Sequence, residues 1–401
     1  MTLLFLYRNL TYLPLRLISP LRVHEIPSKK CDLWFHMASL GEVLAAKGLV
    51  DLALESEFKI LITTFTKAGF KKAFELWGEK ALILRFPWDS LYHVKKIIER
   101  ISPRAFINLE TELWPNTLYL LYKYRIPAFL VNARISEKNF KRIAKLRGFF
   151  SEILIPFVKI FTQTKEDAER LLALGAREQT IKVTGNIKID TAGDGQGHYS
   201  REDLHVSEKE FVIIFSSLRE KEEDFAVNLV TTLKDFNEVK LIFAPRHLNR
   251  VKTILRNLER KGISAVLWTN SKSMNTKVMV LNTLGELRKL YPIADLIIVG
   301  GTFAPYGGHN ILEIAAAGKP ALVGPYHFNI KNEVELIAHN KGLILVQDQM
   351  EAFGRVRELI AQKDLLNEMG LRAKESLNAK KGISKEIFEE ILLHLQETCG
   401  N

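Results

Sequence analysis

Residues 295–325 form the stretch of this sequence that most restricts its fold. An apolar run is followed by glycine pairs at 300–301 and 307–308, then by a helix-like segment that begins at Asn310 and has Glu313 in its first turn, and then by a second apolar run. Glycines at such bends let backbone N–H groups approach a ligand, and a helix start favours a phosphate. The Glu313 carboxylate could accept hydrogen bonds from a ribose diol. The pattern predicts an α/β unit with a nucleotide site, but two ordinary turns with Asn310 as helix N-cap would look the same.

The same alternation of strand and helix patterns is repeated along the chain. Apolar runs predict strands at 33–38, 58–64, 81–86, 104–110, 126–132, 158–164 and 181–188 in the first half, and at 211–217, 240–247, 263–268, 277–283 and 342–346 in the second. Repeated units of this length predict parallel sheets covered by helices on both faces. The loops that follow the strands should then lie along one edge of each sheet, where such folds bind ligands.

The length of the chain predicts two domains. One hydrophobic core rarely supports 401 residues, so we expect domains of about 170 to 200 residues each. A Gly-, Asp- and Ser-rich segment at 190–200 is the best linker candidate. The expected division is a membrane-associated segment at 1–25, a first domain at 26–190, a linker at 191–204, a second domain at 205–375, and a C-terminal helix at 376–401 that packs back across the domains.

Composition restricts the partners. The formal charge of +11 favours an anionic partner, which could be nucleic acid, acidic lipid, or a phosphorylated or carboxylated substrate. Cys31 and Cys399 have no metal-ligand spacing, so we interpret them as free thiols in a reducing compartment. The chain has no D-x-D pair that would suggest a divalent ion holding a diphosphate, and we expect no metal and no cofactor.

The N-terminal segment 1–22 is rich in Leu, Phe and Tyr but is interrupted by Arg8, Pro14 and Arg16. A membrane-spanning helix needs about 20 largely uncharged residues, and a signal peptide needs an uninterrupted apolar stretch. The segment fits neither description well. With the basic residues at 22–30 it suits an interfacial anchor in an anionic leaflet. The alternative is a helix packed on the protein's own core.

Two acidic loops follow predicted strands of the first half. Ser39 and Glu42 form an S-x-x-E pair that is typical of a helix capping box, but Glu42 could also act as a general base for an attacking hydroxyl. Glu110 and Glu112 follow another strand and point in opposite directions, so at most one should face a ligand. Glu110 lies closer to the strand. The alternative is that both are solvated charges before a proline-started helix.

Basic residues mark further loops. Residues 134–150 mix Lys and Arg with Phe, a composition that can bind nucleic acid, a membrane surface or an anionic headgroup, although a solvated helix face is the usual meaning. In the second half, Arg246 and His247 directly follow a strand, which suits an anionic ligand. Gly285 would let the chain approach a base or ribose. Each of these could also be only a turn residue.

Eight segments together resemble, in the same order, the motifs of bacterial 3-deoxy-D-manno-octulosonic acid (Kdo) transferases. They are ASLGE at 38–42, LETELWPN at 109–116, NARISEKNFKR at 132–142, TGNIK at 184–188, APRH at 244–247, LGEL at 284–287, GGTFAPYGGHNILE at 300–313 and GPYHFNIKN at 324–332. The resemblance implies a GT-B glycosyltransferase with two Rossmann-like domains that face each other across a cleft and close around the donor. It also implies inverting transfer of Kdo from CMP-Kdo to a lipid A precursor (lipid IVA) in lipopolysaccharide biosynthesis, at the cytoplasmic face of the inner membrane, without a nucleic acid partner.

The resemblance also implies roles for individual residues. Glu42 would be the general base, and Glu110 and Lys188 would stabilise the transition state. The CMP-Kdo donor would be bound by Pro245, Arg246, Leu284, Gly285, Glu286, Asn310, Ile311, Leu312 and Glu313, and also by Arg219. Because CMP leaves with a single phosphate, no metal would be needed to hold a diphosphate.

Two features depart from the family pattern. The loop after the first strand of the second domain commonly reads S-T-H-E in the family, but residues 217–220 read S-L-R-E, where Arg219 could still contact the phosphate. The N-terminal segment is also more interrupted than the family's usual apolar helix. Two alternatives remain: another GT-B enzyme or an epimerase that uses a UDP sugar, and a non-catalytic membrane-peripheral protein that binds anionic lipid or nucleic acid.

Overall fold

A computed structural model describes residues 2–194 and 197–399 of the chain. The chain divides into two compact units: the first extends to Thr191 and resumes at Gly382, and the second is Ala192–Lys381. The chain thus leaves the first unit after Thr191 and returns to it at Gly382. Part of the predicted linker, residues 195–196, lies outside the described residues.

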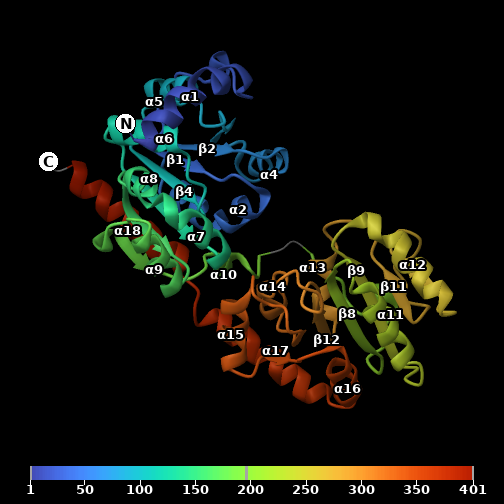
Figure 1. Ribbon diagram of the computed structural model, residues 1–401. Coiled ribbons are helices and arrows are strands. Elements are labelled where there is room, and N and C mark those ends of the chain that lie inside the picture. Colours follow the sequence, from blue (N-terminus) through green and yellow to red (C-terminus); the bar gives the residue numbers. More distant parts are fainter. Residues whose placement is uncertain (1, 195–196, 400–401) are drawn as a thin grey trace. The chain divides into compact units, whose positions relative to one another are not determined.

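The first unit is built around a seven-stranded sheet in which the strand pairs are parallel (Figure 1). The strands follow the order β3-β2-β1-β4-β5-β6-β7 across the sheet. Their bounds are β1 Leu33–His36, β2 Ile60–Thr64, β3 Leu82–Arg85, β4 Ala105–Leu109, β5 Ala128–Ala133, β6 Phe157–Thr162 and β7 Ile181–Val183. The central strands β1, β2, β4 and β5 are buried along their whole length, because helices cover both faces, and this is why they read as unbroken apolar runs.

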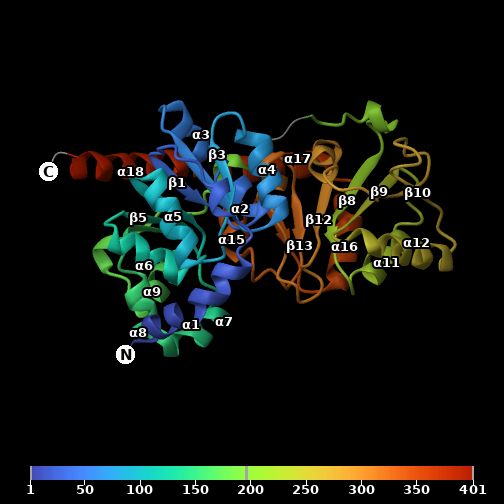
Figure 2. The same cartoon turned by 90° about the horizontal axis from the view of Figure 1, so that it is seen from above.

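Helices cover the first sheet and include one from the end of the chain. Their bounds are α1 Leu3–Ile18, α2 Leu40–Ala45, α3 Lys47–Glu55, α4 Lys67–Trp77, α5 Leu91–Ile101, α6 Pro115–Lys123, α7 Glu137–Ile143, α8 Arg147–Ile153, α9 Lys165–Ala173, α10 Lys188–Thr191 and α18 Ile383–Cys399. Helix α18 packs against α3 within this unit, as Figure 2 shows. The Asp190 carboxylate accepts backbone N–H groups of Gly382 and Ser384, which fixes the start of α18 beside α10.

The second unit repeats the plan with a sheet of order β10-β11-β9-β8-β12-β13-β14. Its strands are β8 Phe211–Leu218, β9 Val239–Pro245, β10 Ala265–Leu267, β11 Val278–Val280, β12 Leu296–Val299, β13 Ala321–Val323 and β14 Leu343–Leu345. Its helices are α11 Glu223–Thr232, α12 Val251–Arg260, α13 Leu287–Leu290, α14 Leu312–Ala316, α15 Lys331–His339, α16 Gln349–Leu359 and α17 Lys363–Asn378. The expected α/β fold with two Rossmann-like domains is confirmed.

Each sheet has a point where the strand order reverses. In the first unit the chain crosses from β3 back to β4, which lies beside β1, and in the second unit β12 lies beside β8. Loops on the two sides of such a reversal diverge and leave a crevice at the carboxyl ends of the strands, which is where ligands bind in open α/β sheets. The loops after β1, β4, β8 and β12 are therefore the first places to look for function.

The N-terminal segment forms helix α1, which packs against α5, α6 and α8 of its own unit. Its inner face is fixed by polar contacts: the Tyr7 hydroxyl donates to Asp89 Oδ2 (3.1 Å) and the Arg8 guanidinium lies 3.4 Å from the ring centre of Tyr119. Its outer face exposes a stripe of leucines at helical spacing, which we call the leucine stripe: Leu3, Leu6, Leu10, Leu13 and Leu17. Within the described residues no helix is both long and apolar enough to cross a bilayer.

Candidate functional site

Glu42 lies in the loop-to-helix junction after β1, at the point where the first sheet reverses its strand order. The Ser39 hydroxyl caps helix α2 by accepting the backbone N–H of Glu42, and it donates to Glu42 Oε1 (2.8 Å). The other carboxylate oxygen, Oε2, accepts the backbone N–H of Ala38 (2.7 Å). The capping geometry expected as the alternative is therefore present, and it orients the carboxylate.

The environment of Glu42 changes its acidity. The side chain is only 5% exposed, and this burial raises the pKa of Glu42 to about 7. The hydrogen bonds from Ser39 and Ala38 lower the pKa, whereas the negative charges of Glu110 and Glu112 raise it. A carboxyl whose pKa lies near neutrality can take a proton in one step and release it in the next, which is what a general base requires.

Glu110 follows β4, the neighbour of β1, and its Oε1 lies 2.7 Å from Lys188 Nζ. Lys188 is the first residue of α10, just after the short strand β7. Glu110 has a left-handed backbone (φ 53°), and its loop is shaped by the Asn108 amide, which donates to the main-chain oxygens of Glu110 and Glu112. The predicted residues Glu42, Glu110 and Lys188 thus meet at one edge of the first sheet.

Glu112 lies near enough to Glu110 and Glu42 for their negative charges to affect one another. Burial raises the pKa of Glu112, and the charge of Glu110 raises it further. Both carboxylates also act on Glu42. The left-handed bend at Glu110 breaks the alternation of a regular strand, so the period-two rule does not apply beyond it.

Sequence reasoning missed the pair that joins the two acidic loops. His36, the last residue of β1, is fully buried, and its Nε2 lies 3.0 Å from Trp114 Nε1. An indole can only donate, so the imidazole accepts at Nε2 and its proton is on Nδ1, which lies 3.0 Å from Thr63 Oγ1. A histidine at the end of an apolar strand, three residues before the S-x-x-E pair, was the only signal available.

The second unit has a cationic group at its strand reversal. Arg219 follows β8, and its Nη1 lies 3.0 Å from His247 Nε2. The guanidinium also stacks on Tyr306, 4.2 Å from the ring centre. Pro245 ends β9, and the adjacent Arg246 is exposed at the same edge, where its backbone N–H donates to Leu218 O. The predicted donor residues Arg219, Pro245 and Arg246 therefore lie together.

His309 joins this group and was not predicted. The pKa of His309 is lowered to about 4, mainly by burial and in addition by the charges of Arg246, Arg219 and His247. Its Nε2 is buried and has no hydrogen-bond partner in the described part of the chain. A neutral imidazole beside two arginines can still donate a hydrogen bond to an anion, and the four side chains together favour a phosphate or carboxylate.

The glycine-rich stretch needs one correction. Helix α14 begins at Leu312 with Ile311 at the N-cap position, so it does not begin at Asn310. The Asn310 side chain instead accepts the backbone N–H of Leu312 (3.1 Å), which forms a local turn before a short helix. Glu313 does lie in the first helical turn, as predicted.

Glu313 is half-buried, and burial raises its pKa, while Arg288 and a hydrogen bond with Asn310 lower it. The fully buried phenol of Tyr291 lies near enough that Glu313 helps to raise its pKa. The Glu313 carboxylate is thus partly desolvated, which strengthens any hydrogen bond that it accepts from a ligand hydroxyl.

The predicted segment Leu284, Gly285 and Glu286 lies in a loop after β11. Gly285 has φ +89°, a conformation that favours glycine. Leu284 is 75% exposed, and Glu286 is engaged by the Tyr199 hydroxyl (2.8 Å). Glu286 therefore orders its own loop, whereas Leu284 and the Gly285 backbone are open to a ligand. Among the described residues no group of three or more His, Cys, Asp or Glu is placed to hold a metal ion.

Comparison with known proteins relates this chain to a glycosyltransferase family. Residues 15–191 match the family model described as 3-deoxy-D-manno-octulosonic-acid transferase (kdotransferase). The 3-deoxy-D-manno-octulosonic acid transferase of Haemophilus influenzae is 26% identical over 373 residues, which cover 91% of this chain and 87% of the relative. A bifunctional glycosyltransferase/methyltransferase of Fusobacterium nucleatum is 29% identical over 320 residues, 77% of this chain; the match spans only 49% of that longer protein.

Among solved structures, a putative UDP-N-acetylglucosamine 2-epimerase from Listeria monocytogenes has the same fold. Its TM-score is 0.66 at 16% sequence identity, and the match covers 92% of this chain and 97% of the epimerase. At this level of identity the likeness concerns the fold alone. It extends over both sheets and agrees with the assignment of a two-domain α/β chain.

Proposed function

Because this chain belongs to the 3-deoxy-D-manno-octulosonic-acid transferase family of glycosyltransferases, we propose that it transfers Kdo from CMP-Kdo to a lipid A precursor in lipopolysaccharide biosynthesis. The observation that most strongly supports the chemistry is the buried Glu42 carboxylate with a pKa near 7, beside the Glu110–Lys188 pair. A catalytic base of this kind is what the attack of a sugar hydroxyl requires.

In the proposed reaction an acceptor hydroxyl oxygen attacks the anomeric carbon of Kdo. Glu42 takes the hydroxyl proton, a new C–O bond forms, and the bond between the anomeric carbon and the CMP phosphate oxygen breaks. This single displacement inverts the anomeric centre. Glu110 and Lys188 stabilise the transition state, in which positive charge develops at the sugar.

The departing CMP carries negative charge, and the second unit has the matching groups. Arg219, Arg246 and the His309 imidazole receive the phosphate, and Glu313 binds the ribose hydroxyls. The arrangement of Arg219 against Tyr306 and His247 supports this role, because a guanidinium held in place before the reaction loses little entropy when the ligand binds.

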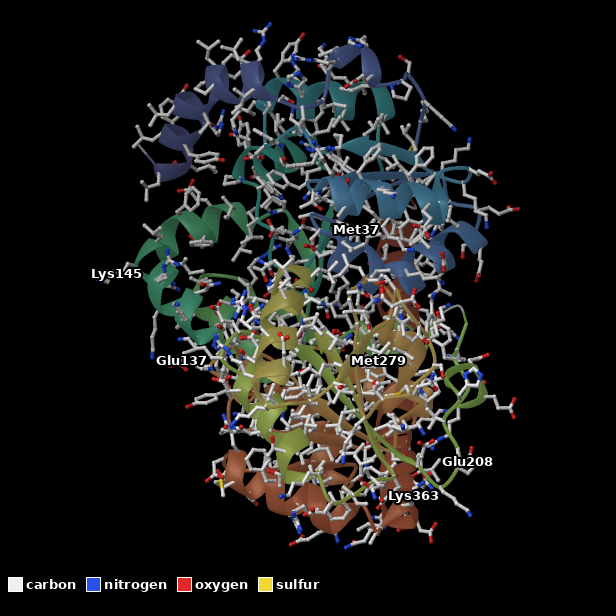
Figure 3. The ribbon with its side chains drawn as sticks, turned by 90° about the vertical axis from the view of Figure 1, so that its right-hand side faces the viewer. Met37, Glu137, Lys145, Glu208, Met279 and Lys363 are labelled. Carbon is white, nitrogen blue, oxygen red and sulfur yellow. The ribbon has the colours of Figure 1, made fainter. Side chains whose placement is uncertain are left out.

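The acceptor is a lipid, and the first unit has a surface suited to a membrane. The leucine stripe of α1 is exposed, and α1 packs against α8, next to the basic residues Lys138, Lys141, Arg142, Lys145 and Arg147. These basic side chains are exposed, and Figure 3 shows Lys145 pointing outward from the first unit. Apolar and basic groups side by side favour peripheral binding to an anionic leaflet, which we place at the cytoplasmic face of the inner membrane.

The proposal is tested by incubating the full-length protein with CMP-Kdo and tetraacylated lipid A precursor and measuring the product mass. We expect products heavier by one or more Kdo units, and no product with the Glu42→Gln variant. Glu351→Gln is a matched control, because Glu351 has the same capping arrangement: Asp348 caps its N–H, and its Oε2 accepts the N–H of Gln347. Full turnover by a folded Glu42→Gln protein would exclude Glu42 as the base.

Nucleotide preference separates this proposal from a UDP-sugar enzyme of the same fold. A ligand that binds only the folded state raises the unfolding temperature, and the rise grows with the logarithm of the ratio of ligand concentration to Kd. CMP should therefore raise the unfolding temperature at concentrations where UDP does not. Protection by UDP alone would favour a UDP-sugar transferase or epimerase. Salt-sensitive lipid binding without any turnover would favour a non-catalytic peripheral protein.

A further inference from the structure

Glu222 is a fully buried carboxylate at the strand reversal of the second sheet. Its Oε2 accepts backbone N–H groups from Arg219 (2.9 Å) and from Gly301 (2.8 Å). Its Oε1 accepts the backbone N–H of Phe303 (2.9 Å). One side chain therefore joins the loop after β8 to the glycine-rich loop after β12, which is 79 residues further along the chain.

A buried carboxylate is costly, so its presence needs a reason. Burial raises the pKa of Glu222, and the hydrogen bonds from the backbone N–H groups of Gly301, Arg219 and Phe303 lower it. Such groups seldom add net stability compared with an apolar replacement of similar volume. What they can provide is a fixed geometry, because several donors converge on one rigid acceptor.

The backbone at this place needs such a constraint. The regular pairing of β8 with β9 is interrupted by a register shift between Phe215 and Leu218, and Ser217 has a left-handed φ of 50°. Gly300 passes so close to β8 that an added Cβ would lie 2.3 Å from Ser216 O. Sheet hydrogen bonds therefore do not by themselves fix the direction in which Arg219 leaves the strand.

The two loops joined by Glu222 also provide two side chains that contact each other. Arg219 comes from the loop after β8, and Tyr306 comes from the glycine-rich loop, three residues after Phe303. We propose that Glu222 is a positioning residue that holds Arg219 against Tyr306, and so places the guanidinium where the phosphate of the CMP-Kdo donor binds. This inference rests on the proposed function. Glu222 acts through Arg219, because both of its oxygens are engaged by backbone N–H groups and it is closed to solvent.

The second unit provides a matched control at the opposite end of the same strand pair. Asp295 precedes β12, and its Oδ2 accepts the backbone N–H of Val212 at the start of β8 (2.7 Å) and lies 2.6 Å from Arg201 Nη2. Glu222 and Asp295 thus join β8 and β12 at their carboxyl and amino ends. Substitution of either residue should lower stability, but only Glu222 lies at the donor edge.

The test compares Glu222→Gln and Asp295→Asn in the full-length protein. We expect Glu222→Gln to raise the Kd for CMP and the KM for CMP-Kdo by about tenfold or more, without a change in the acceptor KM. Asp295→Asn should lower the unfolding temperature and leave both donor constants unchanged. Hydrogen exchange of residues 299–305 should become faster in Glu222→Gln only. An unchanged CMP affinity in Glu222→Gln overturns the inference.

A double-mutant cycle shows whether the effect passes through Arg219. In an Arg219→Ala background, Glu222→Gln should no longer change CMP affinity, because the group it positions is gone. Additive losses would overturn the inference. If Glu222→Gln does not fold, Glu222→Asp is used in its place. Aspartate keeps the negative charge, but its shorter side chain moves the carboxylate away from the backbone N–H donors, so the same rise in donor KM is expected. Wild-type protein that neither binds CMP nor transfers Kdo would overturn the proposed function instead.

Discussion

Trp114 donates a hydrogen bond of 3.0 Å to the buried imidazole of His36 and so fastens the acidic loop after β4 to the strand that leads to Glu42. Trp114→Phe removes the only donor at His36 Nε2 in the described chain and leaves a buried acceptor unpaired. We expect a loss of about 1–3 kcal/mol in the free energy of unfolding. Transfer activity should also fall, because Glu110 and Glu112 belong to the released loop. Urea denaturation and the product assay measure the two effects.

Trp77→Phe is the control for this prediction. Trp77 is also buried in the first unit, and its indole donates to Asp51 Oδ1 (2.8 Å), away from the acidic loops. The Trp77→Phe variant should lose a comparable amount of free energy of unfolding and keep its transfer activity at temperatures where it is folded. Equal loss of activity in both variants would mean that Trp114 acts through global stability alone.

His36 also predicts a dependence of stability on pH. Burial lowers the pKa of His36 to about 3, below the value near 6.5 of an unfolded histidine. Its contribution to stability is therefore fully present above pH 6.5 and is lost as the pH falls toward 3. His36→Gln removes the titrating ring, so the stability difference between wild type and variant should shrink between pH 7 and pH 5. A constant difference would contradict the burial of a neutral ring.

The pH dependence of transfer should report on Glu42. Its pKa of about 7, raised mainly by burial, means that the carboxylate is the major form only above this pH, so kcat/KM for the acceptor should rise with pH through neutrality. Ser39→Ala removes the hydroxyl that donates to Glu42 Oε1, so the pH at which kcat/KM rises should be higher in this variant. Thr164→Ala removes a similar helix cap before Asp167 and should leave that pH unchanged. An unchanged pH dependence in Ser39→Ala would contradict the assignment of the rise to Glu42.

How far the sequence predicts this structure depends on how local each feature is. The strands were predictable because helices cover both faces of each sheet, so β1 and β12 are continuous apolar runs. The S-x-x-E pair predicted both the cap and the candidate base. The partners of His36 and Glu222 were not predictable, because Trp114 is 78 residues from His36 and Gly301 is 79 residues from Glu222. The start of α14 was misplaced because an asparagine can form either a helix cap or the turn before one.

Glu313 is expected to bind the ribose of the donor. Glu313→Ala should weaken CMP binding by about tenfold, the usual range for losing a hydrogen bond to a charged group. Isothermal titration with CMP and with its 2′,3′-dideoxy analogue distinguishes loss of a contact with the ribose diol from disturbance of the loop. If Glu313 binds the diol, the substitution should have little effect on the analogue. Equal losses for both ligands would assign Glu313 to the structure of the loop.

The leucine stripe of α1 predicts how the protein meets a membrane. Replacement of Leu10, Leu13 and Leu17 by serine should lower partitioning to vesicles that contain phosphatidylglycerol by about tenfold or more, because each leucine contributes up to about 1.5–3 kcal/mol on burial. The helix should stay in place, since its inner face is held by Tyr7 and Asp89. Leu371→Ser, an equally exposed leucine of the second unit, is the control. Vesicle flotation measures partitioning, and unchanged partitioning of the triple variant would leave α1 as a helix that only packs on its own unit.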